Sequence, residues 1–353
     1  MKTLDEGYRE ALLAAALFAL SVPLSKLLLR EVDPLVLGGF LYLGAGLATG
    51  LFLLVGLKGE ARLRKGDLPW LLGATVSGGI LAPLALLYGL RLTPAATASA
   101  LLNAEAAATA LLAAWLFREF VGRMAWTGVI SIVAGSVILG VPWEGNWGLT
   151  VGTVLVLAAT VLWGLDNNLT RYISLRDPRG IAVFKGLVAG SFSISLAAAL
   201  GHRLPGIRAI VSALLLGGIS YGASISLFVR ALRHLGAART GALFGTAPFL
   251  GVVFSSLIFW DLPSAAFFMA LPLLAAGTAL LLVEEHEHLH VHEPLLHEHL
   301  HRHDDGHHGH EHPEPVPARH SHLHRHERLV HAHPHRPDIH HRHLHPSGVG
   351  ARR

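Results

Sequence analysis

Long apolar stretches, with short charged or proline-containing segments between them, dominate the sequence. Several reach 18 or more residues with little or no charge, which is the length a helix needs to cross about 30 Å of hydrocarbon. Because a helix satisfies its own backbone hydrogen bonds inside lipid, a series of such stretches predicts a bundle of membrane helices. Hydrophobic residues make up 52% of the chain and charged residues 15%, in agreement with that class.

The two halves of this apolar region repeat each other after an odd number of spans. Trp115–Glu119, near the end of the first half, has a counterpart in Leu257–Asp261, and Phe18 and Trp163 open the halves at matching offsets. With five spans per half, the second copy enters the membrane upside down, a device for alternating access. We therefore predict an all-α membrane protein with ten transmembrane helices as two inverted five-helix repeats.

Three parts follow along the chain: a first repeat at 1–142, a second, inverted repeat at 143–283 and a tail at 284–353. The expected spans are 10–29, 35–57, 69–89, 95–117, 124–142, 149–170, 180–200, 207–229, 236–259 and 264–283.

Orientation follows from lysine and arginine in the short loops. One set of loops carries twelve of these residues and the other set carries four. The richer set of loops and both termini are expected in the cytoplasm. The protein itself is expected in the inner membrane of a bacterial cell. The first span lacks a cleavage site for a signal peptide. The basic excess sets orientation, so nucleic acid is not an expected partner.

The tail has a different composition, because 23 of the 25 histidines follow Glu284. Such low-complexity sequence predicts disorder. Neutral imidazole binds Zn²⁺, Ni²⁺ and Co²⁺, and alternate histidines share one side of an extended chain. The expected metal ligands are His286, His288, His290, His292, His297, His299, His301 and His303.

Two motifs occur along the apolar region: a Trp-Gly-x-x-Asn motif at 163–167 and the run from Leu92 to Glu119. By their order and duplication, the apolar region resembles the EamA branch of the drug/metabolite transporter superfamily. The resemblance covers about residues 10–283 and implies a secondary carrier. Because many members of the family export their solutes, it also implies an exporter. One departure concerns Glu105, which is followed by Ala106 where the family often has proline.

Glu105 is the leading candidate for solute binding or ion coupling. It falls near the centre of a span made of alanine, leucine and threonine, where a charge costs roughly 2.5–3.5 kcal/mol and is usually retained for ion or substrate handling. Asn103 and Ser99 lie four residues apart on a neighbouring face of this span, which predicts a partly polar lining. The alternative is a protonated glutamate that joins helices as a structural hydrogen bond.

A second group of candidates lies on the sixth span. Trp163, Asp166, Asn167 and Thr170 follow helical spacing and form one stripe. An aromatic ring beside a carboxylate and an amide suits a small polar or cationic solute. Lys185, in the next span, could pair with Asp166 as an inner gate, although we favour extension of its side chain to the membrane interface.

Two further candidates lie in the eighth and ninth spans. Tyr221 could line the pathway, or simply bond between helices. Pro248 falls inside the ninth span, beside the position that repeats Glu105, and could break the helix at a binding site.

The function we predict is export of a small metabolite or drug-like solute by alternating access, without enzymatic activity and without a required cofactor. The expected partners are the lipid bilayer and the solute, with a homodimer left open. One alternative is a Zn²⁺, Ni²⁺ or Co²⁺ efflux transporter whose tail collects the ion. Another is a membrane-anchored metal store or sensor that transports nothing.

Overall fold

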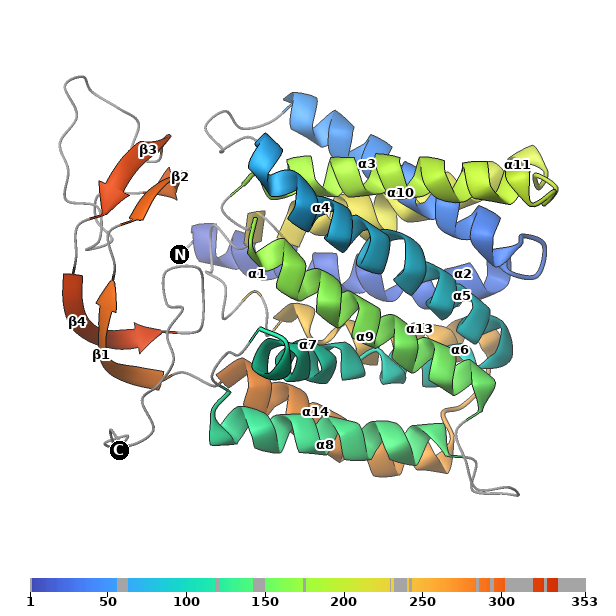
Figure 1. Cartoon of the computed structure of the whole chain (residues 1–353). Coiled ribbons are helices and arrows are strands. Elements are labelled where there is room, and N and C mark those ends of the chain that lie inside the picture. Colours follow the sequence, from blue (N-terminus) through green and yellow to red (C-terminus); the bar gives the residue numbers. More distant parts are fainter. Residues whose placement is uncertain are drawn as a thin grey trace.

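The structure is a computed structural model. It describes residues 2–55, 63–117, 121–141, 150–173, 176–228, 230–231, 240, 243–283, 286–292, 295–301, 320–326 and 329–335. Helices make up almost all of the described chain before residue 284, as Figure 1 shows.

The described part of the first half contains eight α-helices with one 3₁₀ turn (η1) and one π-helical segment (η2). They are α1 (Lys2–Ala19), α2 (Ser21–Leu28), α3 (Pro34–Val55), η1 (Lys65–Asp67), α4 (Leu68–Ala74), η2 (Thr75–Leu81), α5 (Ala82–Leu92), α6 (Ala95–Leu101), α7 (Ala104–Trp115) and α8 (Arg123–Gly140).

The described part of the second half repeats this order and carries its own π-helical segment, η3. It runs through α9 (Val151–Arg171), α10 (Pro178–Ala199), α11 (Ile207–Gly217), η3 (Gly218–Ala223), α13 (Ala247–Phe259) and α14 (Ala265–Val283).

Eight helical stretches in the described chain are long and apolar enough to cross a membrane. They are Glu6–Leu28, Pro34–Phe52, Lys65–Leu92, Ala95–Trp115, Arg123–Gly140, Val151–Arg171, Pro178–Ala199 and Ile207–Phe228. Two shorter apolar stretches, Ala247–Phe259 and Ala265–Leu281, follow them. The ten stretches fall on the ten spans expected from sequence, and eight of them have the length of a span.

The ninth expected span, at 236–259, is described in part. Leu243 and Phe244 are helical, a turn follows at Gly245 and Thr246, and α13 begins at Ala247 with Pro248 in its first turn. Proline is well tolerated there, because the first N–H groups of a helix have no intrahelical acceptor to lose. Pro248 therefore follows an interruption inside the expected span and lies at the start of a helix.

Equivalent spans of the two halves pack against each other. The second spans, α3 and α10, lie side by side, as do the fifth spans, α8 and α14, at the bottom of Figure 1. The fourth spans meet where α6 packs on α13. Packing of like with like is typical of two copies of one fold related by a two-fold axis.

Glycine brings these crossings close. A Cβ atom built on Gly186 would lie 2.6 Å from the backbone of Gly46, so α10 touches α3 with no side chain between them. Gly128 and Gly277 play the same part between α8 and α14, where each added Cβ would meet the other's carbonyl oxygen at 2.8 or 2.7 Å. Small residues allow this approach between membrane helices.

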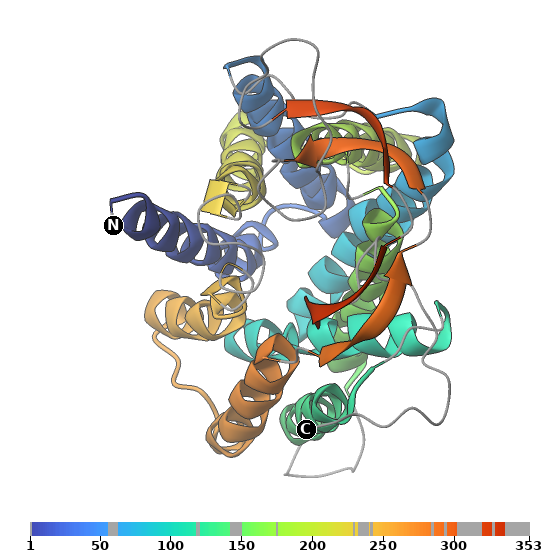
Figure 2. The same ribbon diagram turned by 90° about the vertical axis from the view of Figure 1, so that its left-hand side faces the viewer.

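Four short strands follow the helices: β1 (His286–His292), β2 (Leu295–His301), β3 (His320–His326) and β4 (Leu329–His335). β1 pairs with β4 and β2 with β3, both antiparallel. The strands lie beside one end of the helical bundle, on the side where the N-terminus lies in Figures 1 and 2. Histidine alternating with other residues gives the period of two that a strand requires. The disorder expected of the tail from its composition stays a prediction.

Candidate functional site

The regular helices are interrupted at matching places in the two halves. The fourth span of the first half breaks at Leu102 and Asn103, between α6 and α7. In the second half, a turn at Gly245 and Thr246 precedes α13 in the same way. The third spans carry the π-helical segments η2 and η3. Such interruptions often mark functional sites in membrane carriers.

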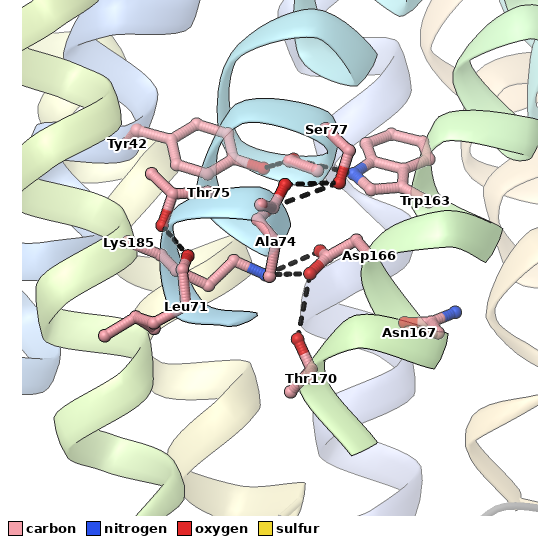
Figure 3. Close-up of polar contacts among 12 residues, drawn as sticks. Tyr42, Leu71, Ala74, Thr75, Ser77, Trp163, Asp166, Asn167, Thr170 and Lys185 are labelled. Atoms are coloured by element: carbon pink, nitrogen blue, oxygen red, sulfur yellow. Dashed lines mark hydrogen bonds and ion pairs between the residues drawn. The ribbon is translucent and has the colours of Figure 1, made fainter. Parts of the chain in front are cut away.

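Gly78, in η2, is where three spans meet. Its carbonyl oxygen accepts a hydrogen bond from the Tyr42 hydroxyl at 2.6 Å and another from Trp163 Nε1 at 3.0 Å. Figure 3 shows both aromatic side chains beside this segment. Trp163 comes from the second half of the chain and Tyr42 from the first, so the two halves share one acceptor.

An ion pair lies next to Gly78. Lys185 Nζ is 2.6 Å from Oδ1 and 2.5 Å from Oδ2 of Asp166, and Thr170 Oγ1 donates to Asp166 Oδ1 at 2.9 Å (Figure 3). The side chains of Asp166 and Lys185 are 10% and 17% exposed. The favoured expectation that Lys185 extends to the interface is wrong, because a buried carboxylate within reach holds its ammonium group.

Absence of a side chain at Gly78 makes room for this pair. A Cβ atom built there would lie 1.9 Å from Asp166 Oδ2 and 2.3 Å from its carboxyl carbon. The carboxylate therefore lies directly against the backbone of η2, and any larger residue would displace it.

Glu105 belongs to a second polar cluster, on the neighbouring face of α9. Asn167 Nδ2 donates to Glu105 Oε1 at 2.9 Å and to Thr109 Oγ1 at 3.2 Å. Asn168 Nδ2 reaches the carbonyl oxygen of Thr109 at 3.1 Å. Glu105 is half-buried in the first turn of α7, where the helix dipole favours negative charge.

Both clusters lie at mid-depth along the spans. Glu105, Gly78 and Tyr42 are each close to the middle of their spans. Asp166 and Asn167 contact these mid-span residues. Asp166 is buried, whereas Asn167 is exposed.

Three further candidates, Asn103, Tyr221 and Pro248, take no part in the hydrogen bonds of these two clusters that are described above. Asn103 is buried, with Nδ2 bonded to the carbonyl of Ala100 at 2.9 Å, and it accepts from Thr278 of α14 at 3.3 Å. Tyr221, in η3, has its ring 6.0 Å from that of Tyr42 and 5.7 Å from that of Phe18. Pro248 begins α13, as described above.

Phe18 and Trp163 hold equivalent places, since each opening aromatic residue meets the π-helical segment of the other half. Sequence reasoning did not single out Tyr42 or Gly78, whereas Thr109 was expected beside Glu105, four residues along the same face of the span. The signals available were a lone tyrosine in an apolar span and the Gly78–Gly79 pair.

No group of three or more histidine, cysteine, aspartate or glutamate side chains could hold a metal ion among the residues whose side chains the structure describes. Of the eight tail histidines proposed as ligands, seven lie in β1 and β2, and His303 lies outside the described residues.

A sequence profile described as the EamA-like transporter family matches the chain twice, at residues 7–141 and 150–283. The chain belongs to the EamA-like transporter family. The two matches give this EamA protein two repeats in tandem, and the family makes it a multi-pass membrane protein that moves a small solute through a lipid bilayer.

Individual relatives of the EamA protein agree with the family match. An uncharacterised transporter of Methanothermobacter thermautotrophicus is 31% identical over 273 residues, which cover 71% of this chain and 79% of the relative. An uncharacterised transporter of a Synechocystis species is 27% identical over 126 residues, or 31% of this chain and 38% of the relative. A solved crystal structure shares the fold, with a TM-score of 0.55 at 19% identity over 79% of this chain and 95% of the other.

Proposed function

We propose that this EamA protein is a ten-span secondary exporter of a small polar or cationic metabolite, that it works by alternating access between inverted repeats, and that it has no enzymatic activity and no required cofactor. Packing of second spans on second spans and fifth on fifth supports the inversion. The protein lies in the cell membrane. The excess of arginine and lysine in one set of loops supports a cytoplasmic location for both of its termini.

The observation that carries this proposal is the pair of polar clusters at mid-depth where the halves meet. Glu105 of the first half bonds Asn167 of the second, and the Asp166–Lys185 pair lies against Gly78 of the first. Polar and charged groups inside a membrane protein mark solute and ion pathways. Since both repeats contribute, relative movement of the halves changes the site.

We assign Glu105 the binding or coupling role. Its partner in the described chain is an amide, whereas Asp166 already has an ammonium partner. A carboxylate without a cationic partner attracts a proton or a cationic solute, and exchange of one for the other couples the two fluxes. Trp163, one turn before Asn167 on α9, supplies an aromatic face for a cation.

The experiment uses purified protein in liposomes loaded with a fluorescent pH indicator. A panel of amino acids, amines and cationic dyes is added, and proton movement reports a transported solute. We expect at least one solute to move protons with the wild type and none with Glu105→Gln, although that variant keeps an acceptor for Asn167 and runs as a folded protein on size-exclusion chromatography.

Glu31→Gln, which removes an exposed carboxylate just after α2, is the matched control and should transport normally. Unchanged proton movement with Glu105→Gln would remove Glu105 from the mechanism. Topology is tested separately with single cysteines at Gly59 and Gly145, which should react with impermeant reagent from opposite sides of the membrane.

A further inference from the structure

The paired strands of the tail bring histidine opposite histidine. In the β1–β4 ribbon the register partners are His286 with His335, His288 with His333, and His290 with His331. In the β2–β3 ribbon they are His297 with His324, His299 with His322, and His301 with His320. Each ribbon therefore contains three consecutive cross-strand histidine pairs at every second position.

Every second position of a strand lies on the same face, so the six paired histidines of each ribbon share one face. The intervening positions of β1 and β4 are largely apolar, since Leu289 is the partner of Ala332 and Val291 the partner of Val330. Composition alone does not produce this arrangement, because a slip of one residue would set histidine opposite an apolar residue along the whole ribbon.

Directly opposed residues in an antiparallel pair have Cβ atoms about 5 Å apart. Imidazole nitrogens bind zinc at about 2.0 Å and are also preferred by copper and nickel. Two opposed histidines, with one or both histidines of the next pair, thus supply the three or four nitrogen ligands of one ion.

We propose that the histidine faces of the two ribbons are binding sites for divalent late transition metals such as Zn²⁺ and Ni²⁺. β1 begins shortly after the end of α14, so these sites lie close to the membrane surface. The sites are separate from the mid-membrane clusters, and the proposal stands or falls independently of the transport proposal.

The first test measures binding of Zn²⁺ and Ni²⁺ to the full-length protein without an affinity tag, in detergent, by equilibrium dialysis. The variant replaces His288, His290, His331 and His333 together by asparagine. The matched control replaces four histidines that lie outside the residues the structure describes: His307, His308, His310 and His312.

Removing the paired histidines of β1 and β4 should remove that ribbon's share of the tightest class of sites, so that fewer ions are bound at low metal concentration, and the control should leave that number unchanged. Equal losses in the two variants would overturn the proposal, because binding would then depend on the number of histidines and not on their pairing.

The second test examines the register directly. The chain has no cysteine, so Leu289→Cys with Ala332→Cys creates a single pair of thiols on the face opposite the histidines. Register partners have Cα atoms within disulfide range, whereas Leu289→Cys with Val330→Cys is displaced by two positions. We expect the first pair to oxidise, with Zn²⁺ affinity retained, and the displaced pair to stay reduced. Equal oxidation of both pairs, or of neither, would contradict the pairing of β1 with β4 on which the proposal depends.

Discussion

At the scale of single residues, a buried ion pair and a glycine determine how the helices pack at the centre of this molecule. Asp166 is 7% exposed, and its compensation consists of Lys185, the Thr170 hydroxyl and close contact with the Gly78 backbone. Removing one partner of a buried pair leaves a charge without compensation, which costs more than removing both.

The ion pair should therefore show strong coupling in a double-mutant cycle. Lys185→Met should lower the free energy of unfolding by roughly 3–5 kcal/mol, because it leaves the Asp166 carboxylate buried alone. Asp166→Asn combined with Lys185→Met should recover most of that loss. Thermal unfolding in detergent measures the stability of each single variant and of the double variant. A loss in the double variant equal to the sum of the two single losses would show that the pair contributes no coupling.

Gly78→Ala should be as damaging as loss of the pair itself. The new methyl group must displace the Asp166 carboxylate, since their atoms would otherwise lie 1.9 Å apart. We expect a loss of about 3 kcal/mol and no transport.

Gly50→Ala is the control for Gly78→Ala, because a Cβ there would meet only Val183 at 3.9 Å. Without a clash, alanine should stabilise α3 by about 0.5–1 kcal/mol. Size-exclusion profiles and unfolding temperatures compare the two, and equal behaviour would contradict the close contact at Gly78.

At the scale of elements, glycine contacts between helices fix which spans touch. Gly186→Ala should disrupt the crossing of α10 and α3, because the new Cβ would lie 2.6 Å from the Gly46 backbone, which cannot rotate away. We expect a loss of about 3 kcal/mol or more. Gly180→Ala, on the same helix, meets nothing closer than 3.9 Å and should unfold like the wild type. Unfolding in detergent distinguishes them.

Apolar length and repetition were enough to predict the positions of the helices, because the hydrocarbon core of a membrane dictates both. They were not enough for Pro248, whose place in a first turn depends on where the preceding helix ends. Nor were they enough for Lys185: a lysine two turns inside a span can extend to the interface or pair, and only the three-dimensional position of Asp166 decides between them. Glu105 was found because a charge inside an apolar span is rare, whereas Gly78 acts through its backbone and leaves no such signal.

At the scale of the whole molecule, helices of the two halves pack extensively against each other. α5 packs on α9, α7 packs on α9, and α1 packs on η3, so spans of one half line spans of the other. Near the start of α4, Arg176 pairs with Asp67 at 2.8 Å and Tyr172 stacks on Trp70 at 4.1 Å, which ties the halves together at one end.

Neither half should therefore be stable alone. A chain divided after Gly145 should give two fragments that are degraded or aggregated when produced separately, since each exposes glycine-lined faces and buried polar groups meant for the other. Produced together, they should co-purify and transport. Co-purification from one membrane is the measurement, and a stable, monodisperse first fragment would show that the halves fold as separate domains.

The bare backbone contact between Gly46 and Gly186 has a mechanical consequence. At Gly46 and Gly186, as at Gly128 and Gly277, backbone meets backbone with no side chain between the two helices. A small rotation about such a point does not require a side chain to change its rotamer there. Under the proposed alternating access, the second and fifth spans would therefore hold the pivots about which the two halves tilt.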